Sequence, residues 1–133
     1  MRITKENIDE FIRGTTMDFY NMDITHIDYI PDHITHFDCS NNQLTSLPKL
    51  PESLMYFYCN KNKLTELPIL PESLRLLYCN DNKLDKLTKL PESLIYLDCH
   101  NNNLPYIVTI KNIKEHNTLI KRKNILEKIR LCH

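Results

Sequence analysis

The sequence is short of glycine and lacks two residue types altogether. Its 133 residues include a single glycine, no tryptophan and no alanine. Phosphate-binding loops and tight strand-to-helix turns depend on glycine, because its missing Cβ permits positive φ and close backbone approach. The composition therefore excludes nucleotide-binding loops, and we expect no cofactor. A chain of this length fits one domain, residues 1–133, rather than a cofactor domain joined to a substrate domain.

Long apolar runs and an excess of one charge are also missing. The apolar runs are only a few residues long and residues 1–5 lead into charged sequence, so we expect neither a membrane span nor a secretory signal. Lys and Arg together number 17, as do Asp and Glu. Because the charges balance, the protein has no overall electrostatic field that favours nucleic acid or a membrane as a partner. The balance is uneven, however, because residues 104–133 carry 7 basic and 2 acidic side chains.

What the sequence has in abundance is a repeat with a period of 20 residues. Its four copies fill residues 24–103 and begin at Ile24, Leu44, Leu64 and Leu84. Each contains a pattern close to L-x-x-L-x-C-x-x-N-x-L. One copy cannot bury enough apolar surface to offset the entropy of ordering its residues, so the copies must stack on one another.

Local spacing within the repeat predicts its backbone. Apolar Phe57 and Cys59 alternate with Tyr56 and Tyr58, a period of two that predicts a short strand with one inward and one outward set of side chains. Six prolines lie in the return legs and predict extended, polyproline-like backbone there: Pro31, Pro48, Pro51, Pro68, Pro71 and Pro91. Four asparagines follow the strands and are expected to satisfy backbone groups of the turns: Asn42, Asn62, Asn82 and Asn102.

On these residues the chain resembles the short leucine-rich repeats of secreted bacterial effectors and of giant viruses of amoebae, and the Cys-bearing L-x-C-x-x-N form is more similar to the viral proteins. The resemblance covers residues 24–103 and extends to residues 14–23 as a degenerate first turn, through Met17, Phe19 and Met22. It implies an α/β-type repeat solenoid, a leucine-rich-repeat arc with a short parallel β-sheet on its concave face. It also implies that macromolecules bind on that face.

Both ends are expected to be helical caps. In the N-terminal cap, residues 1–23, a helix is predicted from Thr4 to Arg13, with Thr4 as N-cap and Gly14 as the C′ residue. In the C-terminal cap, residues 104–133, Ile107 and Ile110 are expected to continue the convex apolar column. A helix over residues 117–131 then places four apolar side chains on one broad face, with Asn117 or Thr118 as N-cap: Leu119, Ile125, Leu126 and Ile129.

The cysteines and histidines suggest metal or nucleophile chemistry, but simpler interpretations are preferred. Four cysteines recur at an inward strand position and would stack in a line that cannot surround a metal tetrahedrally: Cys39, Cys59, Cys79 and Cys99. We interpret them as buried free thiols, which suit a reducing compartment. His33 and His36 near Asp38 are interpreted as surface residues. Cys132 lacks any recognisable partner for nucleophilic catalysis, so no enzyme activity is expected.

The outward strand positions carry the functional hypothesis. Four of the seven tyrosines fall there and merge with neighbouring apolar residues into an exposed patch, a composition typical of protein interfaces. The alternative is that the rings serve only cross-strand stacking. The predicted partner-binding residues are Met55, Tyr56, Tyr58, Arg75, Leu76, Tyr78, Ile95, Tyr96, Asp38 and Asp98.

The sequence thus predicts a monomeric, cytoplasmic, non-enzymatic module that binds a protein, which would be a host protein in the host cytoplasm if the source is viral. Two alternatives stay open. One is a nucleic-acid or lipid adaptor that works through the basic residues Lys121, Arg122, Lys123, Lys128 and Arg130. The other is a substrate-recognition subunit in ubiquitin transfer, although only 30 residues follow the last repeat and bacterial relatives use a far longer catalytic domain.

Overall fold

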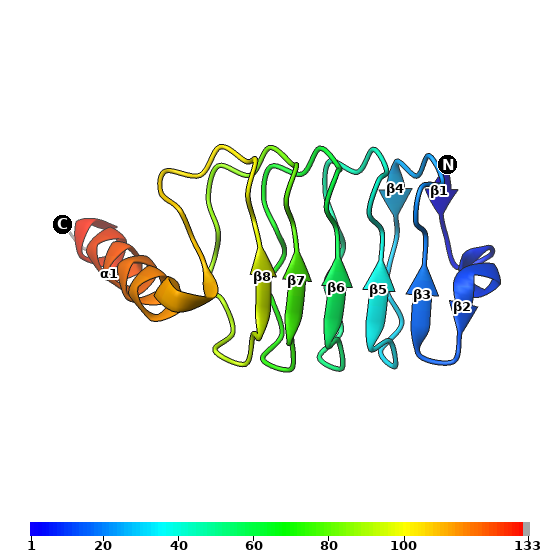
Figure 1. Cartoon of the computed structure of the whole chain (residues 1–133), viewed down its shortest axis with the longest axis horizontal. Coiled ribbons are helices and arrows are strands. Elements are labelled where there is room, and N and C mark those ends of the chain that lie inside the picture. Colours follow the sequence, from blue (N-terminus) through cyan, green and yellow to red (C-terminus); the bar gives the residue numbers. More distant parts are fainter. Residues whose placement is uncertain (132–133) are drawn as a thin grey trace.

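The computed structural model describes residues 1–131 and shows a solenoid in which each 20-residue repeat forms one turn (Figure 1). The turns contribute strands of three residues each: β3 (Thr16–Asp18), β5 (His36–Asp38), β6 (Tyr56–Tyr58), β7 (Leu76–Tyr78) and β8 (Tyr96–Asp98). These strands pair in parallel, and each residue lies opposite the one 20 positions later. With β2 (Ile12–Arg13) added at one end, they form a six-stranded sheet in the order β2-β3-β5-β6-β7-β8.

The alternation predicted for the strands is confirmed. Phe37 and Phe57 point inward, are fully buried and stack with ring centroids 5.4 Å apart. Cys39, Cys59 and Cys79 form a second inward column, also with 0% of their surface exposed, and Cys99 ends it at 7%. The thiols therefore fill the core as small apolar groups.

The asparagines form the predicted column of turn hydrogen bonds. The side-chain Nδ2 of Asn62 donates to the carbonyls of Cys39 in the preceding turn and Cys59 in its own, at 3.0 and 3.1 Å. Its Oδ1 accepts from the backbone N–H of Leu44. The residue before each asparagine has a positive φ, as at Lys61 with φ 56°. Such backbone exposes N–H and C=O groups toward the interior, and the amide satisfies them.

The return legs are extended, as the prolines predict. Residues 47–50 in the second repeat form neither helix nor strand, and the same is true of the equivalent residues 67–70 and 87–90 in the next two repeats. A serine in each of these legs joins it to the preceding turn: the Oγ of Ser73 lies 2.6 Å from the carbonyl oxygen of Glu52 and 2.7 Å from that of Leu54. The legs are therefore held by side-chain hydrogen bonds rather than by a second continuous sheet.

The first turn is formed by the residues that precede the repeats. Met17 and Phe19 are fully buried in line with Phe37 and Cys39, which confirms the degenerate turn. Met22, at the position equivalent to Asn42, is 38% exposed, whereas Ile24, equivalent to Leu44, is fully buried. On the return side, β1 (Arg2–Ile3) pairs in parallel with β4 (His26–Ile27).

The N-terminal cap is less helical than predicted. A 3-10 helix, η1 (Ile8–Phe11), replaces the helix expected from Thr4 to Arg13, and its N-cap is Asn7. The two residues after it form β2, which pairs antiparallel with β3. Gly14, with φ 61°, occupies the first position of the two-residue turn between these strands instead of ending a helix. Sheet pairing has overridden the helical periodicity.

The C-terminal helix starts earlier than predicted. A 3-10 helix, η2 (Ile110–Asn112), runs into α1 (Ile113–Leu131), so the chain becomes helical before Asn117. Thr109 and Asn112 form a reciprocal capping box at the start. Asn117 lies inside the helix, where its side chain accepts from the N–H of Leu90 and donates to the carbonyl of Leu90, both at 2.8 Å.

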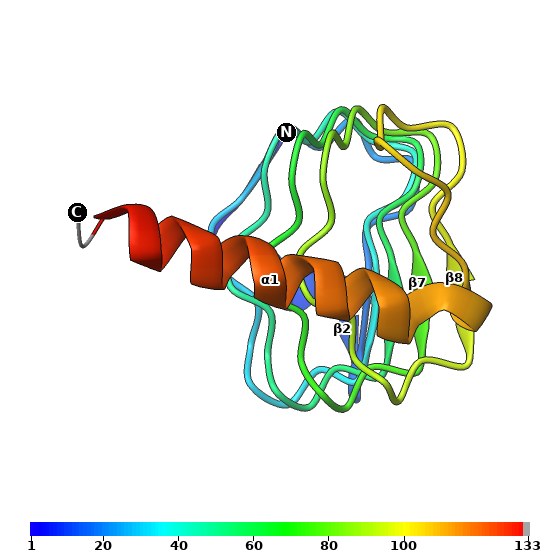
Figure 2. The same cartoon turned by 90° about the vertical axis from the view of Figure 1, so that its left-hand side faces the viewer.

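The residues that seal this end also differ from the prediction. Ile107 is 82% exposed and Ile110 38%, whereas Val108 and Ile113 are buried against the last turn. The face of Leu119, Ile125, Leu126 and Ile129 is exposed. Figure 2 shows α1 crossing the open end of the solenoid and extending past it on the side opposite the sheet. None of the helices within residues 1–131 is both long and apolar enough to cross a membrane.

Candidate functional site: the outer face of the sheet

The predicted partner-binding residues lie together on the outer face of the sheet, here called the strand face. We name seven of them the tyrosine patch: Met55, Tyr56, Tyr58, Leu76, Tyr78, Ile95 and Tyr96. The parallel register places Tyr56 beside Leu76 and Leu76 beside Tyr96. Ile95 and Tyr96 are the most exposed members, at 55% and 61%, and the other members are half-buried against one another.

Two stacked ring pairs organise the patch. Tyr58 and Tyr78 stack with centroids 5.3 Å apart and planes 25° from parallel. His36 and Tyr56 stack at 4.5 Å and 28°. His36 was not among the predicted site residues, although a shift of 20 positions aligns it with Tyr56 and could have identified it. Because cross-strand stacking holds the rings of Tyr56, Tyr58 and Tyr78, this part of the aromatic surface is ordered before any partner arrives.

Carboxylates border the patch on two sides. Asp38 lies opposite Tyr58 on the neighbouring strand, and Asp98 lies opposite Tyr78. Asp18 continues the acidic border one strand beyond Asp38, and sequence reasoning did not include it. Burial, followed by the nearby Tyr78 and Asp38, raises the pKa of Tyr58, so its hydroxyl remains a neutral hydrogen-bond donor. The strand face thus combines the neutral hydroxyl of Tyr58 with negative charge at its borders.

The far border also holds a histidine. The Nδ1 of His100 and the Oδ1 of Asp98 form a close hydrogen bond. This bond and the charge of Asp98 raise the pKa of His100, while the nearby Asp81 adds to the effect. The pKa of Asp81 is lowered by hydrogen bonds from Asn101 and Asn80. Protonation of His100 therefore offsets part of the negative charge at this border.

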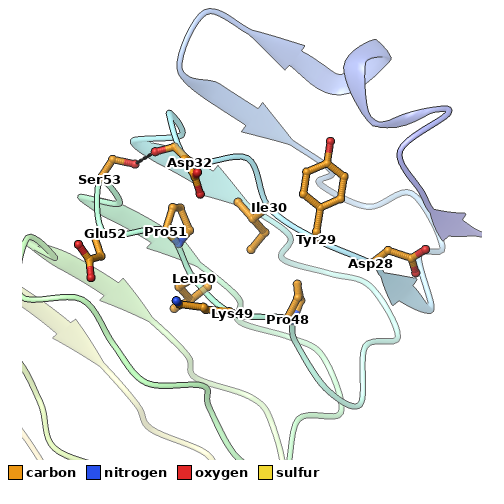
Figure 3. A pocket seen from close by; sticks show the side chains of 10 residues that line it. All are labelled: Asp28, Tyr29, Ile30, Asp32, Pro48, Lys49, Leu50, Pro51, Glu52 and Ser53. Atoms are coloured by element: carbon orange, nitrogen blue, oxygen red, sulfur yellow. Dashed lines mark hydrogen bonds between the residues drawn. The ribbon is translucent and has the colours of Figure 1, made fainter.

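A hollow of about 530 Å³ lies away from the strand face, between the return legs of the first two repeats. Figure 3 shows Asp28 at one end of it and Glu52 at the other. The Oγ of Ser53 lies 2.7 Å from the carbonyl oxygens of Asp32 and Ile34, so it serves the backbone of the neighbouring leg. The carboxylates around the hollow do not converge on one point, and no predicted site residue lines it.

The other sequence candidates are not brought together. His33 and His36 are exposed, as expected of surface residues, and within residues 1–131 no group of three or more His, Cys, Asp or Glu side chains is placed to hold a metal ion. Burial raises the pKa values of Cys39, Cys59 and Cys79 well above the ordinary value, so these thiols remain protonated. Cys132 falls outside the described residues.

The stacked turns, parallel ladder and asparagine column define a leucine-rich-repeat-like solenoid, a class of fold that typically provides a binding scaffold. Among solved structures the chain is similar to YopM from Yersinia enterocolitica WA-314, with a TM-score of 0.67 and 28% sequence identity. The similarity covers 77% of this chain and 23% of that chain, so the present chain matches a small part of the larger protein. No protein-family model and no curated protein matches the sequence.

Proposed function

We propose that the protein is a non-enzymatic interaction module that binds a partner protein on its strand face. The observation that carries the proposal is the tyrosine patch, in which Tyr58 and Tyr78 stack on the outside of the sheet while the thiols of the same turns are buried. Exposed, contiguous aromatic surface is characteristic of protein interfaces.

Rigidity supports this use of the patch. Each strand is fixed by parallel pairing to its neighbour and by the asparagine and serine hydrogen bonds at its two ends. A partner that docks on such a surface loses little free energy to reorganisation of the module, because the rings are already held in place. Tyrosine suits this role, since it offers a large contact area with few rotatable bonds.

The borders support selectivity against acidic partners. Asp18, Asp38 and Asp98 place negative charge around the rings, and an acidic partner surface would meet repulsion there. Arg75 is exposed on the same face and offers a guanidinium to a carboxylate or carbonyl group nearer the centre. We expect a partner whose contact surface is apolar or aromatic at its centre and basic or neutral at its rim.

The proposal includes the cellular compartment and the oligomeric state of the protein. Four reduced, buried cysteines suit a reducing compartment such as the cytoplasm. The resemblance to repeats of giant viruses makes a host protein the expected partner if the source is viral. We propose a monomer, with the strand face available to that partner.

Site-specific photocrosslinking tests the location of binding. A benzophenone amino acid replaces Tyr78 in one variant and Ile69 in a second; Ile69 is 87% exposed on a return leg. Both variants are incubated with extract of the native host cell and irradiated. The proposal predicts a discrete adduct from position 78 that is absent from position 69 and that excess unlabelled protein abolishes. The same adduct pattern from both positions would refute the strand face as the binding surface.

A further inference from the structure

The helix α1 has two apolar faces, and only one of them is used by the fold. Ile113, His116 and Ile120 are spaced by three and four residues and lie buried or half-buried against the last turn. The second face carries Leu119, Leu126 and Ile129, with Ile125 at its margin. At about 100° per residue, the two faces point in largely opposite directions.

The second face is open to solvent. Leu119, Ile125, Leu126 and Ile129 are 49%, 47%, 65% and 51% exposed. We call these four residues the outer stripe. A groove of about 450 Å³ continues the apolar surface between α1, the segment before it and the last turn; Leu119 and Leu126 line it together with Tyr106 and Leu87. The helix α1 lies across the end of the solenoid, and no other backbone segment covers the side of it that is turned away from the solenoid (Figure 2).

Basic side chains border the outer stripe on both flanks. Lys114, Lys121 and Lys128, spaced seven apart, form a row along one flank, and Lys123 and Arg130 form a row along the other. Arg122 lies within the stripe. Over Ile113–Leu131 there are six basic and two acidic side chains. One of the acidic ones, Glu127, is paired with Arg130 at 2.5 Å. The other, Glu115, lies in the first turn, seven residues before Arg122 and therefore on the same side of the helix as the stripe.

We propose that the outer stripe docks this end of the solenoid on an anionic phospholipid surface. Helices that lie in a membrane interface bury an apolar face below the headgroups and place Lys and Arg at the level of the phosphates. Long basic side chains can extend from both flanks toward those phosphates while their stems cover apolar surface. The balanced overall charge gave no reason to expect a membrane partner. The exposed outer stripe between two rows of basic side chains gives such a reason.

Pairing with a second copy fits the charges less well. A symmetric pair of α1 helices would bring the basic row of Lys114, Lys121 and Lys128, or that of Lys123 and Arg130, against a basic row of the other copy. Like charges placed against each other across an interface repel. A phosphate-rich surface complements both rows at once and offers an apolar layer to the stripe between them.

The docked orientation leaves the strand face free. The sheet runs along the solenoid from β2 to β8, while α1 lies across one end (Figure 1). Contact through α1 therefore stands the solenoid on its end, with the tyrosine patch facing sideways into solvent. Lipid docking and protein binding are separable properties, so either can fail without the other.

The chain's lack of tryptophan makes a direct test possible. The full chain carrying Leu126→Trp is mixed with vesicles of phosphatidylcholine and phosphatidylserine, and its emission is compared with that in phosphatidylcholine vesicles alone. The matched control is Ile69→Trp, an exposed isoleucine on a return leg. We expect a shift to shorter wavelength for Leu126→Trp with anionic vesicles only, and no shift for the control. No shift at Leu126, or an equal shift at both positions, would overturn the proposal.

Vesicle sedimentation separates insertion from simple charge attraction. Leu126→Ser with Ile129→Ser, and separately Lys121→Gln with Lys128→Gln, should each weaken binding to the anionic vesicles at least about tenfold. Ile69→Ser should leave it unchanged. Circular dichroism is used to check that each variant is folded. Loss of binding in the lysine variant alone would refute docking through the stripe, as would a dimer in sedimentation velocity that the serine variant abolishes.

Discussion

The Oδ1 of Asn62 accepts a hydrogen bond from the backbone N–H of Leu44, 3.0 Å away in the preceding turn. The amide nitrogen of Asn62 is also hydrogen-bonded, because it donates to backbone carbonyls of both turns. The amide nitrogen also donates to the carbonyl of Asn60 at 3.3 Å, so one side chain bonds four backbone groups and links two turns. The stability of the solenoid depends on such contacts between neighbouring turns, not on any contact between its two ends.

Asn62→Ala should lower the free energy of unfolding by about 1–3 kcal/mol, since it leaves buried backbone groups without partners. Urea denaturation measures the change. The control is Asn103→Ala, at an exposed residue whose side chain makes no hydrogen bond within residues 1–131, and it should change stability by less than about 0.5 kcal/mol. Equal effects of the two substitutions would contradict the role given to the asparagine column.

Lys61 occupies a backbone position that suits other residues better. Its φ is 56°, and the corresponding positions in the other turns hold Asn21, Asn41, Asp81 and Asn101. Asn and Asp tolerate left-handed backbone more readily than a β-branched residue does. Lys61→Val should therefore destabilise the protein by about 1–2 kcal/mol, whereas Lys63→Val, at an exposed position without positive φ, should not. Thermal melts compare the two, and matching midpoints would refute the explanation.

The repeat made the interior predictable and left the caps unpredictable. Cys59 and Asn62 could be assigned to the core and to the turn because every repeat places the same residue types at the same spacing. Gly14 and Asn117 lie outside the repeats, so no equivalent residues in other turns indicate their roles. Their roles were predicted from the general preferences of residues at helix ends. Gly14 instead serves a strand turn, and Asn117 binds the backbone of Leu90.

The C-terminal helix shows a second reason for the difference. Periodicity identified an apolar face with Leu126 and Ile129, but α1 has another apolar face, that of Ile113 and Ile120. Periodicity alone cannot choose between two such faces, because the choice depends on where the chain leaves the last turn. The strand face is different, because Tyr58 alternates with the buried Cys59. That alternation alone predicts that Tyr58 lies on the outer side of its strand.

The thiols of the core column should be unreactive in the folded protein. Cys39, Cys59 and Cys79 are fully buried, and burial raises the pKa of each. In a Cys132→Ser background and mildly alkaline buffer, a thiol-specific colorimetric reagent should label these residues only at the rate of unfolding. Added guanidinium should make all of them react at once. Rapid labelling of the folded protein would show that the column is open to solvent.

The pair of Asp98 and His100 predicts a measurable pH dependence. The folded pKa of His100 is raised above the unfolded value, mainly by its hydrogen bond to Asp98. Its contribution to stability is therefore fully present below the unfolded pKa and is lost as the pH rises through the folded pKa. NMR titration should place the His100 pKa above that of a free histidine, and Asp98→Asn should lower it. If the pKa of His100 were unchanged in Asp98→Asn, its hydrogen bond to Asp98 would not be the cause of the raised pKa.

The central claim is that the tyrosine patch binds a protein partner, and the affinity of the crosslinked partner for patch variants tests it most directly. Tyr58→Thr with Tyr78→Thr removes the stacked rings and keeps residues with strand propensity; Ile69→Thr is the matched control on a return leg. Isothermal titration calorimetry should show the double variant binding at least about thirtyfold more weakly, and the control binding as the parent does. Unchanged affinity in a folded double variant would contradict the account.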